Sequence, residues 1–233
     1  MIKKCILLAA GLGTRLKPLT NHTPKCLVKI QGKPLLDYWL NLLYKHGITN
    51  VLINTHHLSE QVVKFIKSVD TPLEVQLSYE KELLGSLGTI IYNKNFYKDD
   101  ESVLVINADN LTNMNLSRFI ECHLSHNLDA SIGLIETENP SECGIVEMDF
   151  DNNIIGYEEK PIIPKTNISN AGVYLFNTII FRNLEASCVL NDIGNDLLPN
   201  LVGRSYGYLL DEFLIDIGSL SALEKAREKI QIL

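Results

Sequence analysis

Short, almost continuous runs of apolar residues recur along the first half of the chain. They cover residues 6–10, 51–53 and 103–106, and a looser run lies at 75–79. Strands that are covered on both faces have such continuous apolar runs, rather than an alternation of apolar and polar residues. These runs therefore predict the parallel strands of a buried sheet.

Helical patterns lie between these runs. In residues 34–44 the apolar positions have helical spacing, with a proline near the start and Gly47 just beyond the end. Residues 58–69 and 115–126 repeat the helical pattern, and Trp39 of the first helix is expected in the core. Alternating strands and helices predict an α/β protein with a Rossmann-like, doubly wound, mostly parallel sheet.

The pattern changes after Asp129, where short strands and turns follow one another. Strands of this kind, separated by turn residues, are typical of antiparallel hairpins. We expect them to form a separate antiparallel lobe, inserted before the sheet finishes. Its strands are predicted at residues 130–136, 144–148, 154–160 and 172–176.

The C-terminal part of the chain is expected to complete the sheet. Residues 213–218 form an apolar run that contains an aspartate, and a last helix follows. Ser221 and Glu224 stand three residues apart, which is the spacing of a capping box, so they are expected at the start of this helix. No linker or repeat interrupts the sequence, and residues 1–233 are predicted to form a single domain.

Charge and composition exclude several classes of protein. The chain has 233 residues and a net charge of -7, so we expect no nucleic-acid partner, because binding to a phosphate backbone needs a basic face. No segment approaches the ~20 apolar residues of a membrane span. The first apolar run is too short for a secretion signal and continues into a glycine-bearing loop. We expect a cytoplasmic protein with small-molecule ligands, and the assembly state is left open, with a homodimer as one option.

The cysteines and histidines give no metal-site pattern. An odd number of cysteines without C-x-x-C spacing favours reduced thiols over a disulfide framework. The pair His56-His57 has no cysteine or acidic residue at ligand spacing, so a zinc site is not expected. The five cysteines are Cys5, Cys26, Cys122, Cys143 and Cys188.

The first predicted strand runs directly into a glycine-bearing loop with basic residues nearby. Gly11 and Gly13 can bring backbone N–H groups close to a polyanion because no Cβ stands in the way, and Arg15 and Lys25 add positive charge. A plain strand-to-helix turn would explain the glycines alone. The loop lacks the third glycine of a dinucleotide fingerprint, since Leu16 stands there, and it lacks the Gly-Lys-Ser/Thr end of a Walker loop. The two basic residues favour a phosphate-binding loop of another kind.

Two aspartates are expected at the same edge of the sheet as this loop. Asp109 follows the run 103–106, and Asp216 ends the last apolar strand. Ligands of open parallel sheets bind beyond the carboxyl ends of the strands. Because Mg²⁺ is usually held by one or two carboxylates together with substrate phosphates, these aspartates predict a Mg²⁺ site. A single aspartate at a strand end would more often cap a helix.

A lysine in the second half is a candidate for a second phosphate anchor. Lys160 lies at the end of a predicted strand, and Pro161 stops the strand pairing there. Taken alone, Lys160 would be an ordinary solvated charge. The small residues of the segment 170–172 permit the close approach of a polyhydroxylated ligand. Together with this segment, Lys160 becomes a candidate for binding a second phosphate.

In combination, these motifs resemble the sugar-1-phosphate nucleotidylyltransferases. The resemblance covers nearly the whole chain, and the sequence is similar in particular to short guanylyltransferases acting on mannose- or heptose-1-phosphate. It implies transfer of a nucleoside monophosphate from a nucleoside triphosphate (NTP) to a sugar-1-phosphate, Mg²⁺ as cofactor, and an antiparallel lobe that binds the sugar. The motifs that carry it are residues 8–16, 24–25, 85–89, 107–109, 143–146, 158–161, 170–174 and 216–218.

The resemblance also assigns roles to the residues at matching positions. It implies that Arg15 and Lys25 bind the triphosphate and that Lys160 binds the sugar phosphate. Asp109 and Asp216 would hold the metal, which completes the expected set of five catalytic residues. The nucleotide would also contact Leu8, Ala10, Gly11, Gly13, Thr14 and Gly85, with Asp109. The sugar-1-phosphate pocket would contain Asn107, Gly144, Glu159, Lys160 and Asn170.

The base preference follows from a few residues near the expected nucleoside. Residues 80–84 lack the glutamine that thymidylyl- and some uridylyl-transferring relatives use, and Leu87 and Ala108 are larger than the residues usual there. A carboxylate from Glu82 or Glu80 can accept hydrogen bonds from N1–H and N2–H of guanine, which favours GTP. Glu82 is therefore included among the nucleotide-binding residues.

Other functions stay open at this point. The enzyme could be a uridylyl- or thymidylyltransferase for another sugar-1-phosphate, and residues 24–28 and 108–110 are also similar to cytidylyltransferases that activate phosphocholine. A non-catalytic nucleotide-sugar sensor could discard Asp109, Asp216 or Lys160, yet all three are present. A nicotinamide oxidoreductase would rest only on the glycines and the alternation of strands and helices.

Overall fold

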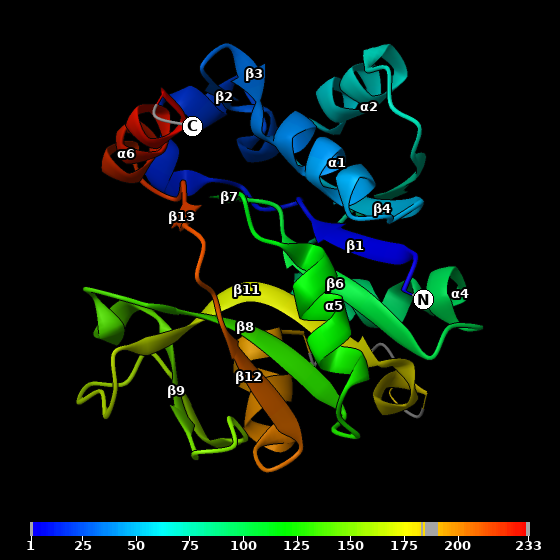
Figure 1. Cartoon of the computed structure of the whole chain (residues 1–233). Helices are drawn as coiled ribbons and strands as arrows, with labels where there is room; N and C mark the ends of the chain where they lie inside the picture. Colours follow the sequence, from blue (N-terminus) through cyan, green and yellow to red (C-terminus); the bar gives the residue numbers. More distant parts are fainter. Residues whose placement is uncertain (1, 183, 185–190, 232–233) are drawn as a thin grey trace.

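The computed structural model describes residues 2–182, 184 and 191–231, and within them a large mixed sheet forms the centre of the molecule (Figure 1). Its strands are β1 (Lys4–Leu8), β4 (Asn50–Thr55), β5 (Glu74–Tyr79), β6 (Ser102–Asn107), β8 (Ala130–Glu136), β9 (Gly144–Met148), β10 (Ile154–Glu159), β11 (Ile168–Asn177) and β12 (Ser205–Leu209). The order across the sheet is β10-β9-β11-β6-β1-β4-β5, with β8 joined to β11 and β12 joined to β8.

The apolar runs of the first half are confirmed as parallel neighbours. β1 lies between β4 and β6 and is parallel to both, and β5 follows β4 at the edge. Leu8, the last residue of β1, is in register with Asn107, the last residue of β6. The loops that leave these two central strands therefore start side by side. The looser run became the edge strand β5, where one side is more exposed.

The expected helices are also confirmed. They are α1 (Leu35–Lys45), α2 (Ser59–Ser68) and α5 (Leu116–Leu124), and Asn115 caps α5 by accepting a hydrogen bond from the Arg118 N–H at 3.2 Å. These helices pack on one face of the sheet together with α6 (Leu220–Gln231). The opposite face is covered by α3 (Gly85–Tyr92) and α4 (Lys94–Tyr97), which the sequence pattern did not indicate.

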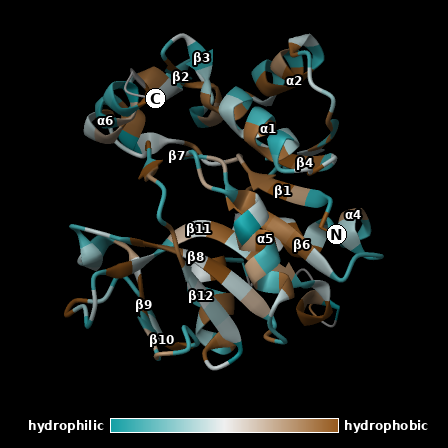
Figure 2. Ribbon diagram, viewed as in Figure 1, coloured by the Kyte–Doolittle hydropathy of each residue, from teal (hydrophilic) through white to brown (hydrophobic). Residues whose placement is uncertain are grey.

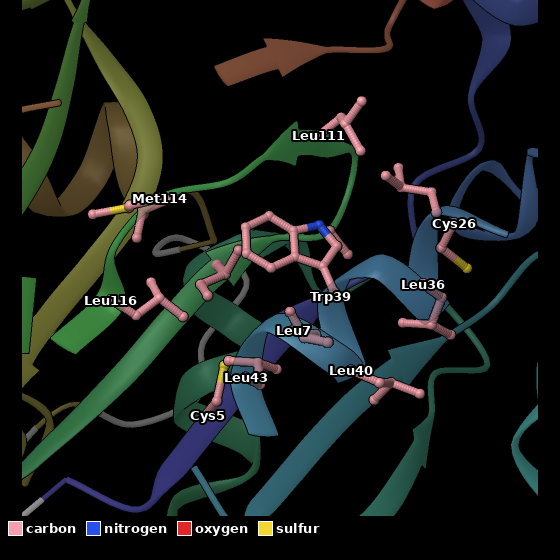
Figure 3. Close-up of a cluster of buried hydrophobic side chains, with 14 of the residues drawn as sticks. Cys5, Leu7, Cys26, Leu36, Trp39, Leu40, Leu43, Leu111, Met114 and Leu116 are labelled. Atoms are coloured by element: carbon pink, nitrogen blue, oxygen red, sulfur yellow. The ribbon is translucent and has the colours of Figure 1, made fainter. Parts of the chain in front are cut away.

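Two apolar clusters, one on each face of the sheet, form the core. Leu7 of β1 points into one cluster and Ile6 into the other, which explains why the strand is apolar at every position. Figure 2 shows hydrophobic residues along β1, β6 and β11. Trp39 of α1 is buried as expected, with its indole ring among Leu7, Leu111 and Met114 (Figure 3).

The antiparallel lobe is confirmed in the second half. The ten-residue strand β11 pairs antiparallel with β6, with Val173 opposite Ile106, and also with β8 and β9. β9 and β10 form an antiparallel pair at the edge. β12 was not predicted, and it is parallel to β8. The long strand β11 thus joins the parallel half of the sheet to this lobe.

The prediction that residues 213–218 complete the main sheet is wrong. This segment contains β13 (Leu214–Asp216), which pairs antiparallel with β7 (Asn110–Thr112) in a separate two-stranded sheet. β7 begins three residues after the end of β6 and is the strand with which β13 pairs. An apolar strand does not reveal its partner, because the apolar pattern reports burial and not pairing.

The predicted capping box is also wrong. α6 begins two residues earlier than Ser221 requires, and Ser219 caps it by accepting a hydrogen bond from the Ala222 N–H at 3.2 Å. Glu224 instead pairs with Arg227 at 2.6 Å. Serine is a common helix cap, and the sequence has one at 219 and one at 221. β13 ends at Asp216 and α6 begins at Leu220, so Ser219 is the residue directly before the helix.

The remaining expectations about cysteines and histidines can be compared with the described residues. Cys5, Cys26, Cys122 and Cys143 are free thiols, and Cys188 lies outside the described part of the chain. His56 Nδ1 lies 2.9 Å from the Glu80 carbonyl oxygen, and His57 Nε2 lies 2.9 Å from that of Thr20. Among residues 2–182, 184 and 191–231, no helix is long and apolar enough to cross a membrane.

A buried histidine joins three strands of the sheet to α5. His123 Nδ1 is 2.9 Å from Ser131 Oγ, and Nε2 is 3.1 Å from Ser102 Oγ and 3.2 Å from Asn177 Oδ1. Burial, followed by the nearby His126, lowers the pKa of His123 from 6.5 to about 4. The folded protein therefore keeps this imidazole neutral.

We predict that this histidine makes the protein sensitive to mild acid. Between pH 6.5 and pH 4 the unfolded chain binds a proton that the folded chain does not, so stability falls as the pH falls. The loss is on the order of 3 kcal/mol of unfolding free energy. The free energy of unfolding, measured with urea at a series of pH values, should fall less steeply with falling pH for His123→Gln than for the exposed control His22→Gln. The same pH dependence in both variants would contradict the role of His123.

Candidate active site

The loop after β1 is held in place by its own contacts. Gly13 has a φ of +62°, and a Cβ there would lie 2.8 Å from Thr20 Cγ2. Thr20 Oγ1 donates a hydrogen bond to the Gly13 carbonyl at 2.7 Å, and the Ala9 N–H donates to Asn54 Oδ1 at 2.6 Å. At Gly11 a Cβ would meet nothing within 4 Å. The loop is therefore tight at Gly13 and open to solvent at Gly11.

Four charged side chains meet beside this loop. Lys25 Nζ lies 2.6 Å from Asp109 Oδ2 and 3.3 Å from Asp216 Oδ1. Arg15 Nη2 lies 3.6 Å from Asp216 Oδ2. The Lys25 side chain is only 10% exposed, whereas Asp109 and Asp216 are 36% and 49% exposed. The ammonium group thus lies beneath two carboxylates that face the solvent.

The small β7–β13 sheet brings the two aspartates together. Asp216 is in register with Asn110, the residue after Asp109, and the Ile217 N–H donates to the Asp109 carbonyl at 3.0 Å. Asp109 itself follows the end of β6, next to the end of β1. The two aspartates expected as metal ligands therefore converge, although Asp216 does not lie on a strand of the main sheet.

The two carboxylates fit a Mg²⁺ ion that is shared with a phosphate ligand. Carboxylate oxygens are the hard donors that Mg²⁺ prefers, and Asp109 and Asp216 both have solvent-facing oxygens. Within the described residues, no group of three His, Cys, Asp or Glu side chains could form a complete metal cage. A Mg²⁺ ion here would need the oxygens of a substrate and water to complete its coordination.

A large open cavity lies next to the charged cluster. Its volume is about 860 Å³, and it is continuous with the expected sugar-side residues. Lys160 follows the end of β10 and is 65% exposed, with Nζ 3.7 Å from Glu159 Oε1. The predicted site residues that line this cavity are Arg15, Asn107, Asp109, Gly144, Glu159, Lys160, Asn170 and Asp216.

Several of the expected nucleotide-binding residues lie around a second, smaller hollow at the cluster. Leu8, Gly11, Lys25 and Asp109 surround a small hollow of about 40 Å³. Ala10, Gly13 and Thr14 belong to the same loop, and Gly85 begins α3, which packs against β1. Arg15 and Asp109 border the large cavity as well. The small hollow and the large cavity thus meet at Asp109.

Of the two glutamates considered for the base, one is used inside the protein. Glu80 is 3% exposed; its Oε1 accepts hydrogen bonds from Asn54 Nδ2 and Thr89 Oγ1, and its Oε2 accepts from the Leu84 N–H. The Glu80 carboxylate is therefore buried and held by three hydrogen bonds inside the protein. Glu82 is exposed and lines none of the cavities described above.

The sequence patterns missed several polar residues next to the large cavity. A second cavity of about 170 Å³ shares Asn107, Glu159 and Asn170 with the large one. Tyr157 lies two residues before Glu159, so the alternation of side chains along a strand could have placed both on one face. Tyr174 lies on β11 within the motif 170–174, and no pattern indicated the remaining residues, which lie on α3 or in the segment 192–194. The second cavity is completed by Ser86, Tyr174, Asp192, Ile193 and Gly194.

Comparison with protein families identifies the class. Residues 4–232 match the family described as nucleotidyl transferase, and the chain belongs to this family. The chain is 31% identical over 222 residues to mannose-1-phosphate guanylyltransferase 1 of Arabidopsis thaliana, covering 92% of this chain and 61% of that protein. It is also 31% identical over 220 residues to the mannose-1-phosphate guanylyltransferase catalytic subunit beta of Drosophila melanogaster, covering 92% of this chain and 59% of that protein. The chain thus spans less than two thirds of the length of these relatives.

Solved structures share the fold over almost the whole chain. HddC from Yersinia pseudotuberculosis, complexed with GMP-PN, superposes with a TM-score of 0.82 at 28% identity, covering 98% of this chain and 100% of that one. A UDP-glucose pyrophosphorylase complexed with UDP-glucose has a TM-score of 0.82 at 22% identity, covering 100% of this chain and 99% of that one. These similarities confirm the predicted fold class.

We predict that the two loop glycines differ in their effect on stability. Gly13→Ala forces a Cβ against Thr20 at a positive φ, which should lower the free energy of unfolding by about 1–3 kcal/mol. Gly11→Ala places its Cβ in open space and should stay within about 0.5 kcal/mol of the parent protein. Chemical denaturation of both variants measures the difference. Equal losses would show that the loop is not held as described.

Proposed function

We propose that the chain transfers a nucleoside monophosphate from an NTP, with GTP favoured, to a sugar-1-phosphate such as mannose- or heptose-1-phosphate. The products are a nucleoside diphosphate sugar and pyrophosphate. One observation carries the proposal: Lys25, Asp109, Asp216 and Arg15 meet between a glycine-bearing loop and a polar cavity of about 860 Å³. This arrangement has the charges that two phosphate-bearing substrates require.

The chemistry needs positioning more than it needs a base. A phosphate monoester oxygen of the sugar-1-phosphate attacks the α-phosphorus of the NTP, and the bond to pyrophosphate breaks. This oxygen is largely ionised at neutral pH, since the second pKa of a phosphate monoester is about 6. No side chain has to remove a proton. The barrier lies in bringing two anions together and in stabilising the charge of the leaving pyrophosphate.

In this proposal the cationic side chains lower this barrier by binding the phosphates of both substrates. Arg15 and Lys25, near the glycine loop, would bind the triphosphate. Lys160, which lines the large cavity, would bind the sugar phosphate. A Mg²⁺ ion held by Asp109 and Asp216 would supply further positive charge to the phosphate oxygens when bound. Asn107, Gly144, Glu159 and Asn170 would surround the sugar.

The preference for GTP has two kinds of support. The curated relatives named above are guanylyltransferases, and HddC is complexed with GMP-PN. Glu82 is exposed in the segment before α3 and is free to accept hydrogen bonds from guanine. A uridylyl- or thymidylyltransferase, a phosphocholine-type cytidylyltransferase and a non-catalytic sensor are the alternatives that the following experiment separates.

We predict the outcome of a substrate matrix. Five nucleoside triphosphates are combined with mannose-1-phosphate, heptose-1-phosphate, glucose-1-phosphate and phosphocholine, with Mg²⁺, and pyrophosphate release is measured. The largest kcat/KM is expected for GTP with mannose- or heptose-1-phosphate. A different best pair would replace the base or the sugar in the proposal. Tight nucleotide binding by calorimetry, without pyrophosphate release from any pair, would favour the sensor.

We predict that Asp109 is essential for this reaction. Asp109→Asn keeps the size of the side chain but removes a charge next to Lys25, and should lower kcat by at least about 10²-fold. Asp37→Asn, which removes a carboxylate from the surface of α1, is the matched control and should keep full activity. Chelation of divalent ions with EDTA should stop pyrophosphate release. Release that continued without a divalent ion would reject the scheme.

A further inference from the structure

A tyrosine and a glutamate form a close pair, and the glutamate lines the two cavities next to the charged cluster. Tyr157 and Glu159 are two residues apart on β10, so their side chains lie on the same face of the strand. The Tyr157 hydroxyl donates a hydrogen bond to Glu159 Oε2 at 2.6 Å. Hydrogen bonds to a charged acceptor are short and about twice as strong as neutral ones. This pair is therefore the strongest contact of the Glu159 carboxylate among the described residues.

Two glycines from different segments leave just enough room for the pair. On β9, a Cβ at Gly144 would collide with the Tyr157 hydroxyl and lie 2.7 Å from Glu159 Oε2. A Cβ at Gly194 would lie 2.8 Å from the same carboxylate oxygen and 3.1 Å from the Tyr157 hydroxyl. The backbone at both glycines therefore lies close to this hydrogen bond, and a side chain at either position would displace the pair.

The two oxygens of Glu159 consequently have different surroundings. Oε2 is taken by Tyr157, and Oε1 lies 3.7 Å from Lys160 Nζ. Glu159 lines both the 860 Å³ cavity and the 170 Å³ cavity, whereas Tyr157 lines neither. Burial, and then the hydrogen bond to Glu159, raises the pKa of the Tyr157 phenol, so the hydroxyl stays protonated as a donor. An effect of Tyr157 on a ligand would therefore pass through a neighbouring side chain, and Glu159 is the one that accepts its hydrogen bond.

We propose that Tyr157 is a positioning residue that fixes the Glu159 carboxylate so that its second oxygen accepts a hydrogen bond from a sugar hydroxyl. The inference rests on the proposed function, because it takes the cavities at Glu159 to be the place of the sugar. It assigns a specific cause to sugar recognition: the carboxylate binds well because its orientation is set before the substrate arrives. Pre-organised groups lose less freedom on binding and so give higher affinity.

The kinetic test removes only the hydroxyl. Tyr157→Phe should raise the KM for the sugar-1-phosphate about tenfold, which is the usual effect of losing a hydrogen bond to a charged group. The KM for the NTP and kcat should change less than twofold. The matched control is Tyr97→Phe, because the Tyr97 hydroxyl is also buried and hydrogen-bonded, but to the Ile90 carbonyl away from the site. The control should change neither KM.

A merely structural role for Tyr157 gives a different result. If the substitution loosened the whole lobe, the KM of both substrates would rise or kcat would fall, and this result would overturn the proposal. A KM for the sugar-1-phosphate equal to that of the parent protein would overturn it as well. A substrate analogue adds a second check. For the monodeoxy sugar-1-phosphate that lacks the hydroxyl bound by Glu159, the parent protein and Tyr157→Phe should have the same KM.

A ligand-free measurement separates this inference from the proposed function. Crystal structures of the parent protein and of Tyr157→Phe should show the Glu159 carboxylate in one orientation in the first and displaced in the second. An unchanged Glu159 in the variant would overturn the positioning role. If no substrate pair gives pyrophosphate release with the parent protein, the proposed function fails, and the crystal structures still decide whether Tyr157 fixes Glu159.

Discussion

The contact of one buried ammonium group with two carboxylates holds the candidate active site together. Asp109 and Asp216 come from distant parts of the chain, and their like charges would repel each other without Lys25 between them. Lys25, with its side chain 10% exposed, in turn would be costly to bury without a partner of opposite charge. Each charge thus makes the position of the others favourable, and Arg15 extends the cluster to the rim of the cavity.

The scaffold determines where this cluster forms. β1 and β6 are neighbours in register, so the glycine loop and Asp109 leave the sheet at the same edge. Apolar clusters pack against both faces of these central strands. Behind the loop, Asn54 connects the Ala9 N–H to the buried Glu80 carboxylate. A network of buried, satisfied hydrogen bonds therefore supports the part of the backbone that would face the phosphates.

The antiparallel lobe adds the second half of the site in a different way. Its strands approach the cluster through β11, which pairs with β6 on one side and with β8 on the other. The lobe supplies Glu159, Lys160 and Asn170 to the same cavity that Asp109 and Asp216 border. The two lobes together form one cavity, lined by charged and polar side chains from both. Membership of the nucleotidyl transferase family agrees with this division of the fold.

Elements with a long apolar or amphipathic pattern could be predicted from the sequence: the parallel strands, α1, α2, α5 and the hairpins of the second lobe. The motif residues near Gly11, Asp109 and Lys160 could be selected because glycine, carboxylate and lysine each have a distinctive chemistry. The partner of β13, the burial of Glu80 and the pair Tyr157–Glu159 could not, because they depend on contacts between segments far apart in the chain or on which side chains face each other. The pattern of apolar and polar residues indicates which positions are buried, because burial follows from the chemistry of each side chain. Which residues lie beside each other depends on how distant segments pack, and this is known only from the tertiary structure.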